Sequence, residues 1–298
     1  MLTEELMREV RRLRVGTRRR VDDLFAGEYQ SAFKGQGIEF AEVREYEPGD
    51  DVRSIDWNVT ARTGKTFVKR FVEERQLTVV YTMDVSASTA FGSVGQTTGR
   101  LLAEVGATLC LAAQNRRDRV GLARFSDSVE SFVPPGRGPR HLMRIMRDLI
   151  SSEPAGQGLA MGETLERLRR VLRRHAVVFV ASDWLLPDDA AHAERVESAI
   201  KLLRRRHEVV AIRATDPRTL RMPNVGLIEL RDAETGARRL IDTASRDVRE
   251  RHDRRAAEQR ASVETMLRRS GVDLVDVRPD QPFINDLLRY FRLRERRR

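Results

Sequence analysis

The stretch Leu77-Thr78-Val79-Val80-Tyr81-Thr82-Met83, followed by Asp84-Val85-Ser86-Ala87-Ser88, decides the fold of this chain. Its first part is mostly apolar and β-branched, which predicts a buried strand. Asp84, Ser86 and Ser88 alternate directly behind that strand, and side chains two residues apart in an extended or turning segment can converge on one side. Because Mg²⁺, Mn²⁺ and Ca²⁺ prefer hard oxygen donors, the stretch predicts a cation site at the end of the strand.

A second predicted strand also ends in an aspartate. Residues 175–183 read His-Ala-Val-Val-Phe-Val-Ala-Ser-Asp, a buried run closed by Asp183. In a doubly wound α/β sheet, ligands bind beyond the carboxyl ends of the strands, where the strand order reverses. If the two strands are neighbours at that point, Asp84 and Asp183 face one cation. The predicted ligands are therefore Asp84, Ser86, Ser88 and Asp183, and Mg²⁺ is the expected ion, weakly bound, with Mn²⁺ or Ca²⁺ as alternatives.

From residue 77 onward, strand patterns alternate with helical patterns. Such alternation predicts an α/β fold with a doubly wound, mostly parallel sheet. Further strands are expected at residues 119–125, 130–133, 208–214 and 272–277, with the second of these stopped by Pro134-Pro135-Gly136. Amphipathic helices are expected around residues 101–112, 142–149, 165–172, 196–203 and 263–267.

Two regions depart from the alternation. Residues 225–230 and 238–241 flank a turn and predict a β-hairpin, inserted at about residues 216–242, that is either a docking surface or a structural flap. Residues 1–76 predict an N-terminal region of its own, with an initial amphipathic helix, a charged and turn-rich middle, and short strands at residues 55–60 and 67–73. We therefore expect two domains, 1–76 and 77–298.

The charged middle of the N-terminal region allows two interpretations. It could present an acidic and aromatic patch that positions a partner beside the metal edge. Alternatively, Arg53 and Arg62 bind the carboxylates of a tight turn and Trp57 fills the junction between the two regions. The residues concerned are Asp50, Asp51, Arg53, Asp56, Trp57 and Arg62.

Longer motifs carry a resemblance to a known family. The chain contains R-E-Y-x-P-G-D-D-V-R-x-I-D-W at residues 44–57, A-R-T-G-K at 61–65, V-K-R-F-x-E-E-R at 68–75 and D-x-S-x-S at 84–88, with S-D-W, H-E-V-V-A-I-R and D-P-R further on. Together they closely resemble the domain of unknown function 58 family. The resemblance implies a von Willebrand factor A-like domain with a metal-ion-dependent adhesion-type site. It also implies frequent pairing with MoxR-type AAA+ ATPases.

One metal-site position departs from the von Willebrand A pattern. Such a domain usually supplies a threonine from a loop ahead of the helix that precedes the second aspartate's strand. Counting back from that helix, the threonine position falls on Leu159, while Thr164 is expected to lie within the helix. A bound cation would then rely on water or on Gln157, which Mg²⁺ tolerates. Without a cation, Asp84, Ser86 and Ser88 would only cap the following turn.

Composition restricts the function classes. The 298 residues include 55 Lys and Arg against 45 Asp and Glu, a formal net charge of +10. The basic clusters are scattered without interleaved aromatic residues, which favours solvated helix faces over a nucleic-acid-binding surface. The sequence contains no apolar stretch near the length of a membrane helix, and its one cysteine, Cys110, cannot form an internal disulfide. A cytoplasmic location is expected.

Three classes of function remain. The first is a non-enzymatic interaction module or adaptor, in which the metal edge binds a carboxylate of a client protein and a MoxR-type AAA+ ATPase supplies the work of a chaperone-like assembly or maturation. The second is a metal-dependent hydrolase or phosphatase, but Ser86 occupies the place where such enzymes carry a second carboxylate as acid and base. The third is a nucleic-acid-binding protein, which only the net charge suggests. The first class is the prediction.

Overall fold

A computed structural model describes residues 39–72, 76–151, 156, 160–187, 189–232 and 236–297. Within this part of the chain, residues from Leu77 onward form one compact unit and residues up to Gln76 form a second. No helix in these ranges is long and apolar enough to cross a membrane.

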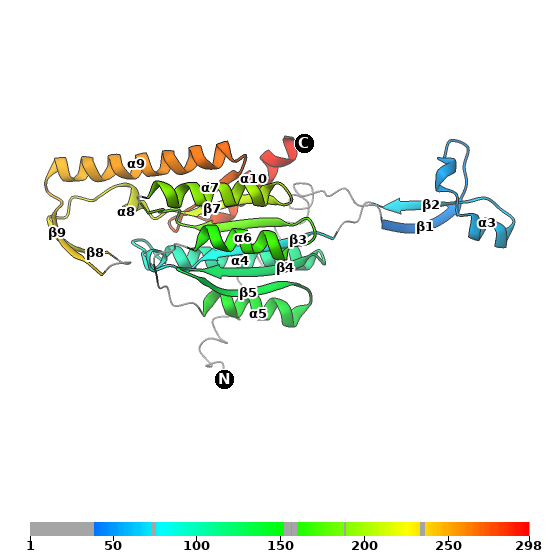
Figure 1. Ribbon diagram of the computed structural model, residues 1–298, viewed down its shortest axis with the longest axis horizontal. Coiled ribbons are helices and arrows are strands. Elements are labelled where there is room, and N and C mark those ends of the chain that lie inside the picture. The colour runs from blue at the N-terminus through cyan, green and yellow to red at the C-terminus, as the bar shows by residue number, and fades with distance from the viewer. Residues whose placement is uncertain are drawn as a thin grey trace. The chain divides into compact units, whose positions relative to one another are not determined.

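The larger unit is built on a six-stranded sheet (Figure 1). Its strand order is β10-β7-β6-β3-β4-β5, and every neighbouring pair is parallel except β4 and β5. The strands are β3 (Thr78–Asp84), β4 (Arg119–Phe125), β5 (Val129–Gly136), β6 (Val177–Ser182), β7 (Glu208–Ala214) and β10 (Asp273–Val277). The predicted fold class, α/β with a mostly parallel sheet, is confirmed.

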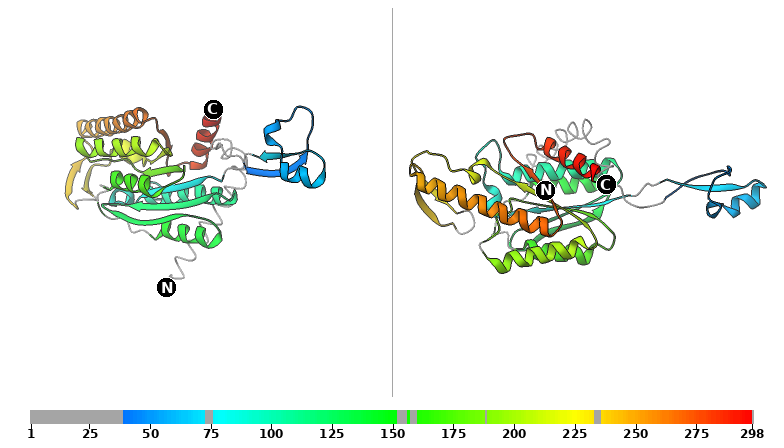
Figure 2. Two further views of the ribbon diagram at one scale, coloured as in Figure 1. Left: turned by 45° about the vertical axis from the view of Figure 1, so that its right-hand side comes forward. Right: turned by 90° about the horizontal axis from the view of Figure 1, so that it is seen from above.

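Helices cover both faces of this sheet. They are α4 (Thr98–Asn115), α5 (Pro139–Ile150) and α10 (Phe283–Arg296), and on the opposite face α6 (Met161–Val171), α7 (Ala190–Arg204) and α9 (Arg246–Arg269). Figure 2 shows α4 and α10 on one side of the sheet and α9 on the other. Val80, Val178 and Val180 point toward α6, α7 and α9, while the Tyr81 hydroxyl donates to the Leu102 carbonyl of α4 at 2.7 Å. This two-sided burial explains why β3 and β6 are almost continuously apolar.

Gly106 lets α4 approach β3 closely. A Cβ atom at this position would lie 2.5 Å from the Tyr81 ring, so a side chain there would push the helix away from the sheet. Tyr81 is fully buried, and its hydroxyl has a backbone acceptor one helical turn away from Gly106. The helix that follows the decisive strand is therefore held at a fixed distance from it.

Three sequence predictions about elements of this unit are corrected. Pro134 and Pro135 do not stop the edge strand, because β5 continues to Gly136; an edge strand tolerates proline, whose missing N–H can face away from the sheet. The helix α10 was not predicted, although Phe283, Leu287 and Phe291 recur on its buried face at helical spacing. A short helix, α8 (Pro217–Leu220), was also missed.

The predicted hairpin is present. Its strands β8 (Leu227–Arg231) and β9 (Arg238–Asp242) pair antiparallel with each other and form a separate two-stranded sheet. Most of their residues are exposed. The base is closed by Thr243, whose N–H donates to the Gly226 carbonyl at 2.9 Å and whose hydroxyl accepts from Val225 N at 3.0 Å. The hairpin is thus an addition to the α/β unit and lies outside its core.

The smaller unit is an antiparallel pair, β1 (Glu39–Glu45) with β2 (Phe67–Val72), and a helix α3 (Trp57–Thr63). The strand predicted at residues 55–60 was wrong. Asp56 caps the first turn of α3 by accepting from Asn58 N at 3.0 Å and Val59 N at 3.3 Å, and Gly64 ends the helix at φ 73°. β1 was read as charged turn sequence, because four of its residues are acidic or basic. The predicted initial helix lies outside the described residues.

Candidate metal centre

The carboxyl ends of β3 and β6 meet at the point where the strand order reverses. β3 pairs with β4 on one side and with β6 on the other, so the chain leaves β3 toward one edge of the sheet and later returns to build the other. Asp84 is the last residue of β3, and Asp183 directly follows β6. The predicted juxtaposition of these two aspartates is therefore present, at the place where α/β proteins bind ligands.

Asp84 is buried, and its carboxylate is held by hydrogen bonds. Oδ1 accepts from Ser86 N at 2.8 Å, and Oδ2 accepts from the Ser182 hydroxyl at 2.7 Å. Ser182 Oγ in turn accepts from Trp184 N at 2.9 Å. These bonds connect the ends of the two strands, since Asp84 belongs to β3 and Ser182 to β6.

The two predicted hydroxyl ligands lie next to each other. Ser86 Oγ and Ser88 Oγ are 3.1 Å apart, and the backbone between them begins a short 3₁₀ turn, Ala87–Ala90. Ser86 makes no side-chain cap bond to this turn. The interpretation in which these hydroxyls serve only as caps therefore does not account for Ser86.

Asp183 carries a buried oxygen atom with no partner. Its Oδ1 accepts from Leu185 N at 3.0 Å, whereas Oδ2 is buried and makes no hydrogen bond within the described part of the chain. A buried carboxylate oxygen without a partner costs free energy on the order of 1–3 kcal/mol, and more when it is charged. A cation at this position would satisfy the atom.

Two neighbouring buried carboxylates make ionisation unfavourable. Burial, and next the charge of Asp183, raise the pKa of Asp84 to about 7, with the hydrogen bonds from Ser86 and Ser182 opposing the shift. Burial likewise raises the pKa of Asp183, and the hydrogen bond from Leu185 N opposes the shift. Like charges this close disfavour each other, and a divalent cation between them would reverse the effect.

The donors fit a hard divalent cation of modest affinity. Asp84, Asp183, Ser86 and Ser88 offer only oxygen atoms, the ligand type that Mg²⁺ prefers. Nowhere in the described ranges do three or more His, Cys, Asp or Glu side chains gather as a metal cluster, so water would complete the coordination. Leu159, at the expected threonine position, and Gln157, the possible substitute ligand, lie outside the described residues. Thr164 lies inside α6, as expected, and is buried.

In the N-terminal network, the structure adds a residue that the sequence analysis did not name. Asp50 is held by Arg44, whose Nη2 lies 2.6 Å from Oδ1, and by Glu47 N at 3.0 Å. Arg44 thus binds one carboxylate of the turn, and the expected roles of Arg53 and Arg62 stay predictions. The Glu47 hydrogen bond, opposed by partial burial and supported by Arg44, lowers the pKa of Asp50.

Two other predicted residues of this network, Asp51 and Asp56, make hydrogen bonds within their own turns. Asp56 caps α3, and Asp51 accepts from the Ser54 hydroxyl through its backbone carbonyl at 2.6 Å. Trp57 is 68% exposed, and its place at the junction between the two regions stays a prediction. The side chain of Arg53 lies outside the described part, and Arg62 is exposed in the last turn of α3.

Residues 42–262 match the model of one family, described as "Protein of unknown function DUF58". The chain belongs to the DUF58 family. The match begins in β1 and ends within α9, so it includes both units and the whole candidate metal centre.

Comparison with sequence relatives agrees with this membership. The chain is 32% identical over 296 residues to the uncharacterized protein Rv1480 of Mycobacterium tuberculosis, covering 98% of this chain and 90% of the relative. It is also similar to an aerotolerance-related membrane protein from Bacteroides fragilis, with 16% identity, a TM-score of 0.46, and coverage of 74% and 100%. A von Willebrand factor type A structure from Catenulispora acidiphila gives 14% identity, a TM-score of 0.35, and coverage of 65% and 44%.

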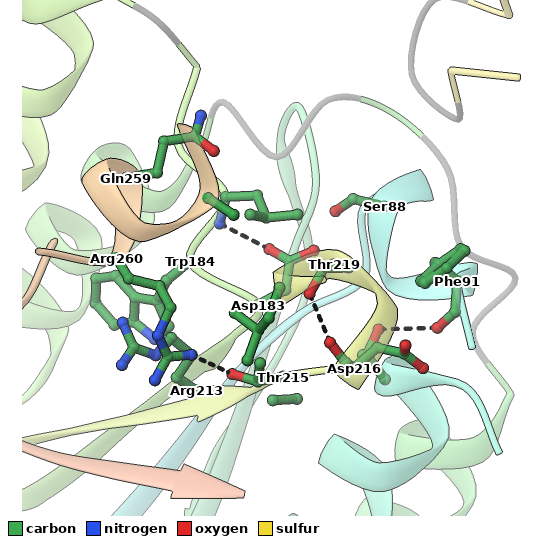
Figure 3. A pocket seen from close by; sticks show the side chains of 15 residues that line it. Ser88, Phe91, Asp183, Trp184, Arg213, Thr215, Asp216, Thr219, Gln259 and Arg260 are labelled. Atoms are coloured by element: carbon green, nitrogen blue, oxygen red, sulfur yellow. Dashed lines mark hydrogen bonds between the residues drawn. The ribbon is translucent and has the colours of Figure 1, made fainter. Parts of the chain in front are cut away.

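Sequence reasoning missed a pocket beside this centre. Ser88 and Asp183 form one end of it, and Trp184, Arg213 and Arg260 form another wall (Figure 3). Arg213 and Asp216 belong to the motifs H-E-V-V-A-I-R and D-P-R of this DUF58 protein, so the only signal in the sequence was their presence in family motifs. Their shared pocket depends on the docking of α8 and α9, which the sequence pattern does not encode.

Proposed function

We propose that this DUF58 protein is a non-enzymatic interaction module whose carboxyl-edge site holds a divalent cation, Mg²⁺ foremost. Asp84, Asp183, Ser86 and Ser88 would hold it. The observation that carries the proposal is the buried Asp183 Oδ2 without a hydrogen-bond partner, next to a second carboxylate and two adjacent hydroxyls. A bound cation would supply an open coordination position for a carboxylate of a partner protein.

The protein's own residues would orient that position. Ser182 and Ser86 N fix the Asp84 carboxylate, and Leu185 N fixes one oxygen of Asp183, which leaves the other oxygen available. A hydrolase at the same place would need a group that transfers protons. The side chain two residues after Asp84 is instead the Ser86 hydroxyl, paired with Ser88 at 3.1 Å, which favours binding over hydrolysis.

The partner we propose is a MoxR-type AAA+ ATPase, together with a client protein that the pair assembles or matures. This part of the proposal rests on the family resemblance alone. A cytoplasmic site of action is proposed with it. The cation could join this protein to its partner, because an exposed coordination position contributes little to the stability of the core. Binding through that position would then not be needed for folding.

Calorimetry and a pull-down test the proposal together. Wild type should give a saturable Mg²⁺ or Mn²⁺ titration and Asp84→Ala none, and recovery of purified ATPase should fall about tenfold, or about 1.4 kcal/mol, with chelator or with Asp84→Ala. Asp280→Ala is the matched control, since this exposed carboxylate also follows a strand of the sheet and bonds Arg278. Identical titrations for wild type and Asp84→Ala would show that Asp84 does not bind the cation. Equal recovery in every pull-down would show that the cation does not bridge the protein to the ATPase.

A further inference from the structure

A pocket of about 210 Å³ lies beside the metal centre, at the carboxyl ends of β6 and β7 (Figure 3). The loop after β3, the helix α8 and the middle of α9 close its other sides. Much of the wall is apolar and consists of Phe91, Trp184, Leu185, Leu220 and Ala256. Pockets for drug-sized ligands measure roughly 300–1,000 Å³, so this one has room for about a single amino-acid residue.

One wall of the pocket contains a buried arginine with an unused donor. Arg213 is 2% exposed, and its Nε and Nη2 bond Asp276 at 2.6 and 2.9 Å. Nη2 also bonds Glu264 at 2.7 Å. The remaining nitrogen, Nη1, is buried and has no hydrogen-bond partner among the described residues. A buried guanidinium nitrogen without an acceptor is costly, which points to an acceptor that a ligand supplies.

The guanidinium group of Arg260 lies next to that of Arg213. Arg260 Nη1 bonds the Thr215 hydroxyl at 3.0 Å (Figure 3). Its Nη2 bonds Asp276 at 3.3 Å. Because Thr215 accepts this bond, its own hydroxyl hydrogen is free to turn toward the pocket. Arg213, Arg260 and Thr215 thus place donors on the same wall.

The acidic groups of the pocket are at its opposite side, and most of their oxygens are already bonded. Asp216 accepts from Ser93 N at 2.7 Å, the Ser93 hydroxyl at 2.5 Å and Arg218 N at 2.8 Å. Asp183 belongs to the metal centre, where a cation would offset its charge. Glu264 and Asp276 are engaged by Arg213 and Arg260 behind the donor wall.

We propose that this pocket binds an apolar monocarboxylate of the size of one amino-acid residue, with the carboxylate on Arg213 Nη1 and the apolar body against Phe91, Trp184 and Leu220. A carboxyl-terminal residue of a polypeptide and a free N-acyl amino acid share this chemistry. An arginine that presents several N–H groups suits a carboxylate, and apolar walls reject a more highly charged anion such as phosphate. The pocket does not require the cation, since Arg213 and the apolar wall are not among its ligands.

Calorimetry with three probes tests the proposal on the full chain in magnesium. The probes are N-acetyl-leucine, its primary amide, and a peptide of four glycines ending in a leucine with a free carboxylate. The free acids should bind at least about tenfold more tightly than the amide, because only they satisfy the guanidinium. Tight binding of the peptide identifies a chain terminus as the source, and binding of N-acetyl-leucine alone identifies a small molecule. Equal binding of acid and amide, or no binding of any probe, overturns the proposal.

Two variants locate the site. Arg213→Lys keeps a cation for Asp276 but cannot present the second nitrogen, so binding of the acids should fall at least about tenfold. Ala256→Phe fills the pocket from α9 and leaves both guanidinium groups and their carboxylate partners in the sequence, and Ala257→Phe, at the exposed neighbouring position, is the matched control. Thermal unfolding shows which variants fold. If Ala256→Phe folds and binds like Ala257→Phe, the ligand does not occupy this pocket and the proposal fails.

Discussion

Several buried polar side chains in this protein lack partners, and their effects differ with their surroundings. Asp183 Oδ2 belongs to the strand-end site and Arg213 lines the pocket beside it, so a cation or a ligand would supply the missing partner there. His207, by contrast, is 3% exposed just before β7, and both of its ring nitrogens are buried without a partner in the described residues. Burial, and next the charges of His175 and Arg206, lower the pKa of His207 to about 4. It is therefore a cost to stability.

His207→Leu should raise the free energy of unfolding at pH 7 by about 1–2 kcal/mol, because it removes two unsatisfied polar atoms from the interior. The folded-state pKa is below the unfolded value of 6.5, so wild type loses stability as the pH falls from about 6.5 to about 4. The variant lacks this loss, and its advantage should grow over the same interval. Urea unfolding at pH 7 and pH 4.5 measures both.

The exposed His175 provides the control, since His175→Leu should change stability by less than about 0.5 kcal/mol. A constant difference between wild type and His207→Leu from pH 7 to pH 4.5 would show that His207 does not titrate in this interval.

Among the elements, the hairpin and the helix α10 differ in how much they pack against the larger unit. β8 and β9 contact mainly each other and expose Leu227, Leu230 and Leu240. The helix α10 instead buries Leu287 and Phe291 completely against the unit. An isolated two-stranded hairpin is at best marginally stable, so its own residues hold it only weakly in place.

Replacing residues 227–242 with two glycines should change the free energy of unfolding of the chain by less than about 1 kcal/mol, because Gly226 and Thr243 already meet at 2.9 Å. Thr243→Val is the comparison; it removes the hydroxyl bonds at the base of the hairpin and should cost about 1 kcal/mol. Urea unfolding measures both variants. Loss of cooperative unfolding in the deletion would mean that the hairpin stabilises the core. Loss of ATPase recovery with normal stability would identify it as a docking surface.

Over the whole molecule, one place where basic residues gather is the carboxyl ends of helices. Helices α6, α7, α9 and α10 each carry two basic residues in their last turn. Such residues offset the negative ends of the helix dipoles. Three of these helices lead directly into β6, β7 and β10, so their basic ends lie where the strands begin, at the edge opposite Asp84 and Asp183. This arrangement gives a structural reason for a part of the basic content of the chain.

Random duplex DNA should therefore bind weakly, with a Kd above about 1 µM at physiological salt, and the affinity should fall steeply as salt increases because it rests on counterion release. Fluorescence anisotropy at several salt concentrations measures the slope. Sequence-selective binding that persists at physiological salt would contradict this expectation and favour a nucleic-acid function.

Local sequence patterns were sufficient to predict the strands of the sheet and the proximity of the two aspartates. Alternating and continuous apolar runs identified every strand of the six-stranded sheet, since burial on one or two faces leaves a direct pattern in the sequence. Asp84 and Asp183 could be placed together because the carboxyl ends of parallel strands lie at one edge. The predictions for the segments that form α3 and β1 were wrong, and in both segments the cause is local. Asp56 as a cap and Gly64 as a terminator outweighed β-branched residues, and charged residues in β1 concealed a strand.

The sequence by itself thus determined the six strands of the larger sheet and the edge at which Asp84 and Asp183 meet. Only the tertiary structure decided the pocket, because Arg213, Glu264 and Asp276 come from β7, α9 and β10 and meet through the docking of those elements. It also decided that Asp183 Oδ2 and Arg213 Nη1 have no partner among the described residues, since a side chain's hydrogen bonds depend on every segment packed around it. Periodicity reports which face of an element is buried, and it does not report which distant side chains meet there.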